Sequence, residues 1–175
     1  MQNHLATIVA VGALSLGTAC ASSAQPPAAR AVGVERRQCD GSANGQDEIQ
    51  LLQSAKVLRL DPIYSNVPTA NNGTEERANG AKLLVRPPKG VSAEQLTRIL
   101  QCHSARVLLG QVSGVAVPND PYWLPDAWVN IDVKPEDGNF AVTLSADSIH
   151  DNLRVLHRAS RYADDHTLAT EPALP

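Results

Sequence analysis

Aromatic residues are scarce in this chain, which has two tryptophans, three tyrosines and one phenylalanine among its 175 residues. The hydrophobic core must therefore be built mainly from leucine, valine, isoleucine and alanine. Basic charge is not in excess either, because the formal net charge is -3 at pH 7. A mildly acidic chain lacks the electrostatic footprint that nucleic-acid binding requires. We therefore expect no nucleic-acid partner.

The chain also lacks the short motifs that identify common enzymes. It contains no G-x-x-x-x-G-K-[ST] phosphate loop, no G-x-G-x-x-G dinucleotide fingerprint, no G-x-S-x-G nucleophile elbow and no H-E-x-x-H zinc motif. The segment Gly110–Gly114 is close to the elbow, but its serine stands one place late. We therefore predict that the protein is not an enzyme and that it holds no cofactor or metal.

The first apolar run is short and ends at a cysteine. Residues 5–19 carry no charge, and a run of this length suits a secretory signal rather than a membrane-spanning helix. The sequence Leu16-Gly17-Thr18-Ala19-Cys20 resembles the lipobox of bacterial lipoproteins. That resemblance implies that residues 1–19 are removed and that Cys20 becomes a lipid-bearing N-terminus. Because Ala21 rather than aspartate follows, it also implies an outer-membrane lipoprotein that faces the periplasm.

A second cleavage site lies shortly after the first. Ser22-Ser23-Ala24 before Gln25 fits the small-x-small rule of ordinary signal peptidase, which would release a secreted protein. The residues before the apolar run include no lysine or arginine, and Gly17 stands where a lipobox most often has leucine. Lipidation at Cys20 and simple secretion therefore both stay open.

The rest of the chain divides into a tether, one domain and a tail. Residues 20–34 are small and contain prolines, so we predict that the lipidated cysteine is followed by a flexible tether. Residues 35–163 are enough for a single globular domain, and residues 164–175 are expected to be a loose tail. The domain keeps Cys39 and Cys102, and an even pair in an oxidising compartment predicts a disulfide. Two separate buried thiols are the alternative.

Hydrophobic periodicity predicts four strands. Residues 55–63 and 81–86 have strand patterns, and the polar residues 68–80 between them are rich in turn signals. Two alternating runs, 129–133 and 140–144, flank the turn sequence Pro135-Glu136-Asp137-Gly138 and predict a hairpin.

Two long helices complete the predicted fold. One begins at the capping box of Ser92 and Gln95, and the other begins at Ser148 with Asp151 at its third position. A further short helix is suggested over residues 47–54. The order ββαββα predicts an α+β two-layer sandwich, in which two helices cover a mostly antiparallel four-stranded sheet.

Three of the six aromatic residues lie in one proline-rich segment, residues 120–128. Flat rings and carboxylates in a loop held by prolines are typical of a binding surface, here for an envelope protein or a cell-wall glycan. The candidate binding residues are Asp120, Tyr122, Trp123, Asp126 and Trp128. The alternative is a plug that covers one end of the core. Trp128 is expected to point away from the buried face of the strand that follows it.

Histidines suggest two weaker sites. His103 lies in the apolar face of the first long helix, where we favour a core histidine that bonds a backbone carbonyl over a catalytic base or metal ligand. A basic stripe with helical spacing runs along the second long helix and suits contact with an anion, although a solvated helix face is the alternative. The stripe consists of His150, Arg154, His157 and Arg161.

One short segment resembles a known family. Asn139-Phe140-Ala141-Val142-Thr143-Leu144-Ser145, followed by a helix, is similar to the strand–helix core of the BON domain of secreted and membrane-associated bacterial proteins. The closing glycine–valine strand of that family is missing, and the resemblance implies no site residues. Together, these observations predict an envelope lipoprotein that acts as a non-enzymatic binding or structural module.

Overall fold

The computed structural model describes residues 25–40 and 45–167. Its elements are α1 (Pro27–Gln38), α2 (Gly45–Ser54), β1 (Val57–Pro68), β2 (Thr74–Val85), α3 (Ala93–Leu108), β3 (Val129–Glu136), β4 (Asn139–Ala146) and α4 (Ile149–His166). The strands form one antiparallel sheet in the order β1-β2-β4-β3, so the α+β class and the four-stranded sheet are confirmed. The prediction of a fold with two helices was wrong, because the described residues form four. The short helix suggested over residues 47–54 is α2, whereas α1 was not predicted.

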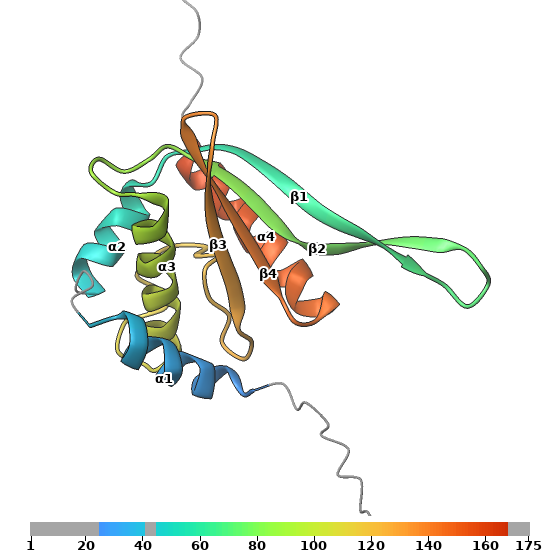
Figure 1. Ribbon diagram of the computed structural model, residues 1–175, viewed down its shortest axis with the longest axis horizontal. Helices are drawn as coiled ribbons and strands as arrows, with labels where there is room; N and C mark the ends of the chain where they lie inside the picture. The colour runs from blue at the N-terminus through green and yellow to red at the C-terminus, as the bar shows by residue number, and fades with distance from the viewer. Residues whose placement is uncertain (1–24, 41–44, 168–175) are drawn as a thin grey trace, which may run out of the picture.

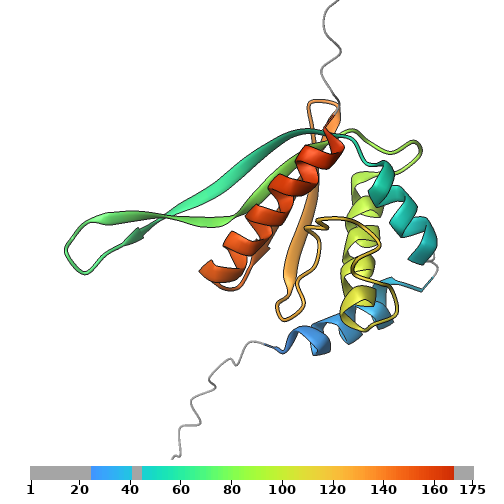
Figure 2. The same ribbon diagram turned by 180° about the vertical axis from the view of Figure 1, so that it is seen from behind.

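The hydrophobic core lies on one face of the sheet. Leu144 of β4 is paired with Ala81 of β2 on one side and with Ile131 of β3 on the other, and all three side chains are buried. α4 crosses this face, α3 lies beside β3, and the connection between α3 and β3 runs between the two helices (Figures 1 and 2). The long irregular connection is therefore part of the helical layer.

Local sequence signals fix the predicted helix starts and the second hairpin. Ser92 accepts a hydrogen bond from the backbone of Gln95, whose side chain accepts one from the backbone of Ser92, and Ser148 caps α4. The β3–β4 turn uses Asp137 and Gly138, which both have positive φ angles of 51° and 75°. Positive φ at both central residues is what a two-residue hairpin turn requires.

β1 and β2 are longer than predicted and extend beyond the body of the domain (Figure 1). β2 pairs with β4 only over Ala81–Val85, so its first half pairs with β1 alone. Residues 68–80, which we expected to form turns, therefore supply half of β2, and only residues 69–73 make the turn. A two-stranded ribbon buries little on either side, so its sequence shows no strong apolar alternation.

Gly80 lies where this ribbon leaves the body. Its φ angle is 134°, and a Cβ atom at this position would lie 2.0 Å from the backbone oxygen of Leu144. The pairing of β1 with β2 also shifts register here, between Ile63 and Tyr64. Glycine is required because the backbone of β2 must pass close to β4 while the ribbon bends away.

Helix α1 corrects the expected tether. We predicted that residues 20–34 would be flexible, but α1 begins at Pro27, and proline is favourable at the first position of a helix. α1 buries Ala31 and Val34 in a second apolar cluster, together with Cys39, Cys102 and Ala105 of α3. The part of the expected tether from Pro27 onward is therefore part of the folded domain.

The chain ends of the domain also differ from the prediction. α4 continues to His166, past the expected boundary at residue 163, and Thr167 forms a parallel bridge with Val57. Residues 168–175 of the expected tail, like residues 1–24, lie outside the described residues. The predicted disulfide is confirmed, because Cys39 and Cys102 are bonded with their Cα atoms 5.6 Å apart. This bond joins the end of α1 to the middle of α3.

Candidate functional site

The segment 120–128 is not a continuous surface. Asp120 and Tyr122 are buried, with 0% and 2% of their surface exposed, so these two predicted binding residues belong to the core. Trp123 is half-buried, and the guanidinium carbon of Arg158 lies 4.8 Å from the centre of its ring. The alternative of a plug is therefore right for the first half of the segment. Asp126 and Trp128 line a hollow in the surface.

Asp120 is placed by His103, which the sequence had marked as a core histidine or a base. His103 Nε2 lies 2.6 Å from Asp120 Oδ2, and the backbone N–H of Tyr122 donates to Asp120 Oδ1 at 2.9 Å. A carboxylate oxygen accepts hydrogen bonds, so Nε2 carries the hydrogen atom and donates it. Both side chains are 1% exposed. The pair attaches the connecting segment to α3. His103 is therefore a core residue as we favoured, but its partner is a carboxylate and not the backbone carbonyl that we expected.

A second buried polar cluster lies between α1, α2 and α3. The Arg106 guanidinium donates to Glu48 of α2 and to Glu35 of α1, the latter at 3.5 Å, and also to the backbone oxygen of Cys39. Glu48 has no exposed side-chain surface, and its burial raises the pKa of this carboxyl to about 7. The positive charge of Arg106 opposes that rise. Two carboxyls that share one guanidinium in the interior favour protonation of one of them.

This pKa predicts that the protein loses stability as the pH rises. The folded state holds the Glu48 proton more tightly than the unfolded state, whose pKa is 4.5, so the stabilisation is complete below pH 4.5 and is lost as the pH passes about 7. Between pH 5 and pH 8, we expect the free energy of unfolding to fall by about 2–3 kcal/mol through this group. Urea denaturation at both pH values measures the change.

The Glu48→Gln variant should remove most of this pH dependence, because its amide does not titrate. Glu94→Gln is the matched control, since Glu94 is exposed in the first turn of α3. Comparing each variant with the wild type cancels the contributions that the proteins share. If the free energy of unfolding changes equally with pH in the wild type and in Glu48→Gln, then Glu48 is not the group responsible for the pH dependence.

The basic stripe on α4 is not a row of unpaired cations. Arg154 donates to Asp126 at 2.6 Å and to Asp151 at 3.0 Å. His150 is 80% exposed and lies 3.6 Å from the same Asp151, and His157 and Arg161 are also exposed. Two carboxylates therefore already pair with Arg154. Contact with an anion stays a prediction only for the other residues of the stripe, which are His150, His157 and Arg161.

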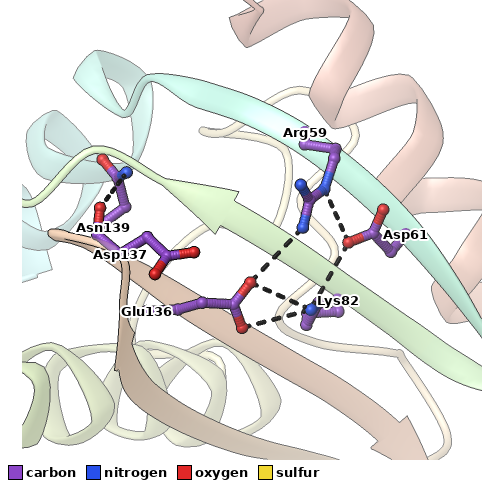
Figure 3. Close-up of polar contacts among 6 residues, drawn as sticks. All are labelled: Arg59, Asp61, Lys82, Glu136, Asp137 and Asn139. Atoms are coloured by element: carbon purple, nitrogen blue, oxygen red, sulfur yellow. Dashed lines mark hydrogen bonds and ion pairs between the residues drawn. The ribbon is translucent and has the colours of Figure 1, made fainter.

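The face of the sheet opposite the core carries charges that pair with one another (Figure 3). Lys82 of β2 bonds both carboxylate oxygens of Glu136, at 3.2 and 3.3 Å, and Arg59 of β1 contacts Asp61 and Glu136. These ion pairs join β1, β2 and the end of β3 on a face that no described helix covers. Each of these four charged side chains is paired with at least one of opposite sign.

A hollow in the described surface lies between α1 and Trp128. It has a volume of about 270 Å³ and is lined by Gln25, Ala29, Arg30, Gly33, Val34, Arg37 and Trp128. Arg30 is held in place by Asp147, whose Oδ2 lies 3.0 Å from its guanidinium nitrogen. The guanidinium of Arg37 lies over Gly33, because a Cβ atom on Gly33 would be 3.2 Å from it. This hollow therefore presents two guanidinium groups beside an indole ring and has no carboxylate in its lining.

A second hollow shares Trp128 and Gln25 but has the opposite chemistry. Its volume is about 220 Å³, and its charged lining residues are Asp126, Asp147 and Asp151. Trp128 itself packs against the apolar cluster around the disulfide rather than with the main core. This confirms that Trp128 points away from the buried face of β3.

Arg30 and Arg37 were not predicted as site residues, because the first lay in the expected tether and the second had no assigned role. The signal that places them together is helical spacing, since residues 30, 33 and 37 share one face of a helix that starts at a proline. The predicted lipidation residue, Cys20, lies outside the described residues. Within residues 25–40 and 45–167, no helix is long and apolar enough to cross a membrane. The same residues contain no group of three or more side chains that is suited to hold a metal ion.

Comparison with known proteins identifies no relative: no family model matches the chain, and neither a curated protein nor a solved structure matches it. Its function must therefore be argued from its own residues.

Proposed function

We propose that this protein is a bacterial envelope lipoprotein, anchored to the outer membrane through Cys20, whose domain faces the periplasm and acts by binding rather than by catalysis. The observation that carries the proposal is the short distance between the lipobox and the folded domain. Pro27, the first residue of α1, follows Cys20 by seven positions, and α1 is bonded to α3 through Cys39. A lipid on Cys20 would hold one defined end of the domain at the membrane.

The disulfide supports the same compartment. Disulfides persist in oxidising environments such as the periplasm and are rare in the cytosol of most bacteria. Cys39 and Cys102 are 4% and 0% exposed, so the bond is shielded from reductants. The lipobox and the disulfide are independent features of the sequence, and both favour export.

Burial of the titratable core pair supports binding over catalysis. The side chains of His103 and Asp120 are each only 1% exposed, so a substrate does not reach them. The projecting ribbon of β1 and β2 instead offers an exposed feature, with Tyr64 half exposed on a strand that leaves the body. We propose an envelope protein or a cell-wall glycan as the partner on the side turned away from the membrane.

The mass of the native, membrane-extracted protein tests the anchor. We expect a chain that begins at an acylated Cys20 and gains about 2 Da on reduction, from the two hydrogen atoms added to the disulfide. The Cys20→Ser variant should leave the membrane fraction and keep the Cys39–Cys102 bond. A native chain that begins at Gln25 without acyl groups would overturn the proposal and show a secreted protein.

A further inference from the structure

We infer that the hollow between α1 and Trp128 binds the phosphate group of an anionic phospholipid in the membrane that carries the anchor. The inference rests on the proposed function, because it assumes that Cys20 is lipidated. It gives the domain a second contact with the membrane, which would fix the orientation of the domain above the bilayer.

The arrangement of the two arginines suits a phosphate. Arg30 and Arg37 are seven positions apart, about two helical turns, and the Arg37 guanidinium lies over Gly33, which has no side chain to displace it. Guanidinium groups bind phosphate oxygens through paired hydrogen bonds. Asp147 holds Arg30 by one nitrogen, which leaves other N–H groups of that guanidinium available.

Charge distinguishes this hollow from its neighbour on the other side of Trp128. The lining of the α1 hollow includes two arginines and no acidic residue, whereas the neighbouring hollow includes three aspartates. The first hollow therefore favours an anion more than the second does, although the three aspartates of the second are paired with Arg154 and Arg30. Trp128 supplies an apolar wall beside the phosphate, and tryptophan is enriched at the depth of lipid headgroups.

The length of the chain before the hollow makes the lipid the favoured source of the anion. Gln25 lines the hollow and is five residues from Cys20, a segment that spans at most roughly 17 Å when fully extended. α1 is the first described helix of the chain and lies at one end of the domain (Figure 1). The anchor therefore keeps the hollow close to the headgroups, and docking becomes an intramolecular step that needs little affinity of its own.

Trp128 can report on docking when it is the only tryptophan. We would place the native lipidated Trp123→Phe protein in vesicles of phosphatidylglycerol or phosphatidylcholine that carry a quencher at headgroup depth. We expect strong quenching of Trp128 in phosphatidylglycerol, weak quenching in phosphatidylcholine, and relief at high salt. The Trp128→Phe protein, which reports from Trp123, is expected to show little quenching in either vesicle.

Arg37→Ala and Arg36→Ala form a matched pair of variants in the Trp123→Phe background. Both remove one positive charge from the same turn of α1, but only Arg37 lines the hollow. We expect Arg37→Ala to lower the ratio of docked to undocked protein about fivefold and Arg36→Ala to change it less than about twofold. Equal effects would show that general attraction of α1 to the membrane, and not a site, explains the docking.

Further measurements distinguish a phospholipid from a soluble anion as the ligand of the hollow. Quenching that is unaffected by millimolar inorganic phosphate supports a lipid in the bilayer. A Trp128 signal that responds to inorganic phosphate or to purified peptidoglycan fragments, with no quenching by lipid, would overturn the inference. Flotation of the vesicles tests the anchor separately: protein that floats without quenching of Trp128 contradicts this inference alone, and protein that fails to float contradicts the proposed function as well.

Discussion

Replacing Asp120 by alanine is expected to lower the free energy of unfolding by about 3–5 kcal/mol, because it removes one partner of a buried polar pair. The change would leave His103 Nε2 and the backbone N–H of Tyr122 without acceptors in the core. Tyr122 packs edge-to-face on Tyr162 of α4, with ring centres 5.7 Å apart, so its displacement would also loosen α4. Urea denaturation followed by circular dichroism measures the loss.

Asp126→Ala is the matched control, since it removes an aspartate from the same segment. The Asp126 side chain is 70% exposed, and its ion pair with Arg154 is at the surface, so the expected change is within about 0.5 kcal/mol of wild type. Asp120→Asn should lie between the two, because its amide oxygen still accepts from Tyr122. Similar stabilities for the Asp120→Ala and Asp126→Ala proteins would mean that the buried pair contributes little.

The sequence suggested each member of this pair but not their contact. His103 was placed on a buried helix face by its spacing, and Asp120 was assigned to a surface because it is charged and flanked by prolines. The two residues are 17 positions apart, and the segment between them has no periodicity that would predict its path. A hydrogen bond of this kind follows from tertiary packing, and only the position of the connecting segment between α3 and α4 brings the two side chains together.

Predictions held where the signals were local. Ser92 with Gln95 and Ser148 with Asp151 specified the starts of α3 and α4, and Asp137-Gly138 specified the hairpin turn. In each case, a backbone N–H or a positive φ angle demands a particular residue type within a few positions. Such demands are visible in one sequence because they do not depend on the rest of the fold.

Predictions failed where an element depends on distant contacts. Residues 27–38 have few large apolar side chains, and α1 is stable because Ala31 and Val34 lie against the disulfide and α3. The outer half of β2 contains Glu75, Glu76 and Arg77, a polar run that resembles a loop. It forms a strand because it pairs with β1 along its whole length. For the same reason, the α1 hollow was not predicted: Arg30 lay in the expected tether and was therefore not considered as a site residue.

Removal of the disulfide is the second change with a large expected effect. The bond closes a loop with a sequence separation of 63, for which the chain-entropy model predicts a stabilisation of about 4 kcal/mol. The Cys39→Ser/Cys102→Ser protein should therefore unfold at markedly lower urea concentration than the wild type. The loss of stability should be larger in the α1 region than in the sheet, because α1 loses its covalent attachment to α3.

Hydrogen exchange can resolve this difference between regions. We expect the amides of α1 to lose protection in the double variant, while those of β4 and α4 keep most of theirs at low denaturant. Wild-type protein treated with reductant under denaturing conditions and then refolded should behave like the double variant, which controls for the two serine hydroxyls in an apolar cluster. If α1 stays protected in both proteins, then Ala31, Val34 and the Arg30–Asp147 ion pair hold it against the domain without the disulfide. In that case, the bond acts only by restricting the unfolded chain, and the position of the α1 hollow does not depend on the redox state of its surroundings.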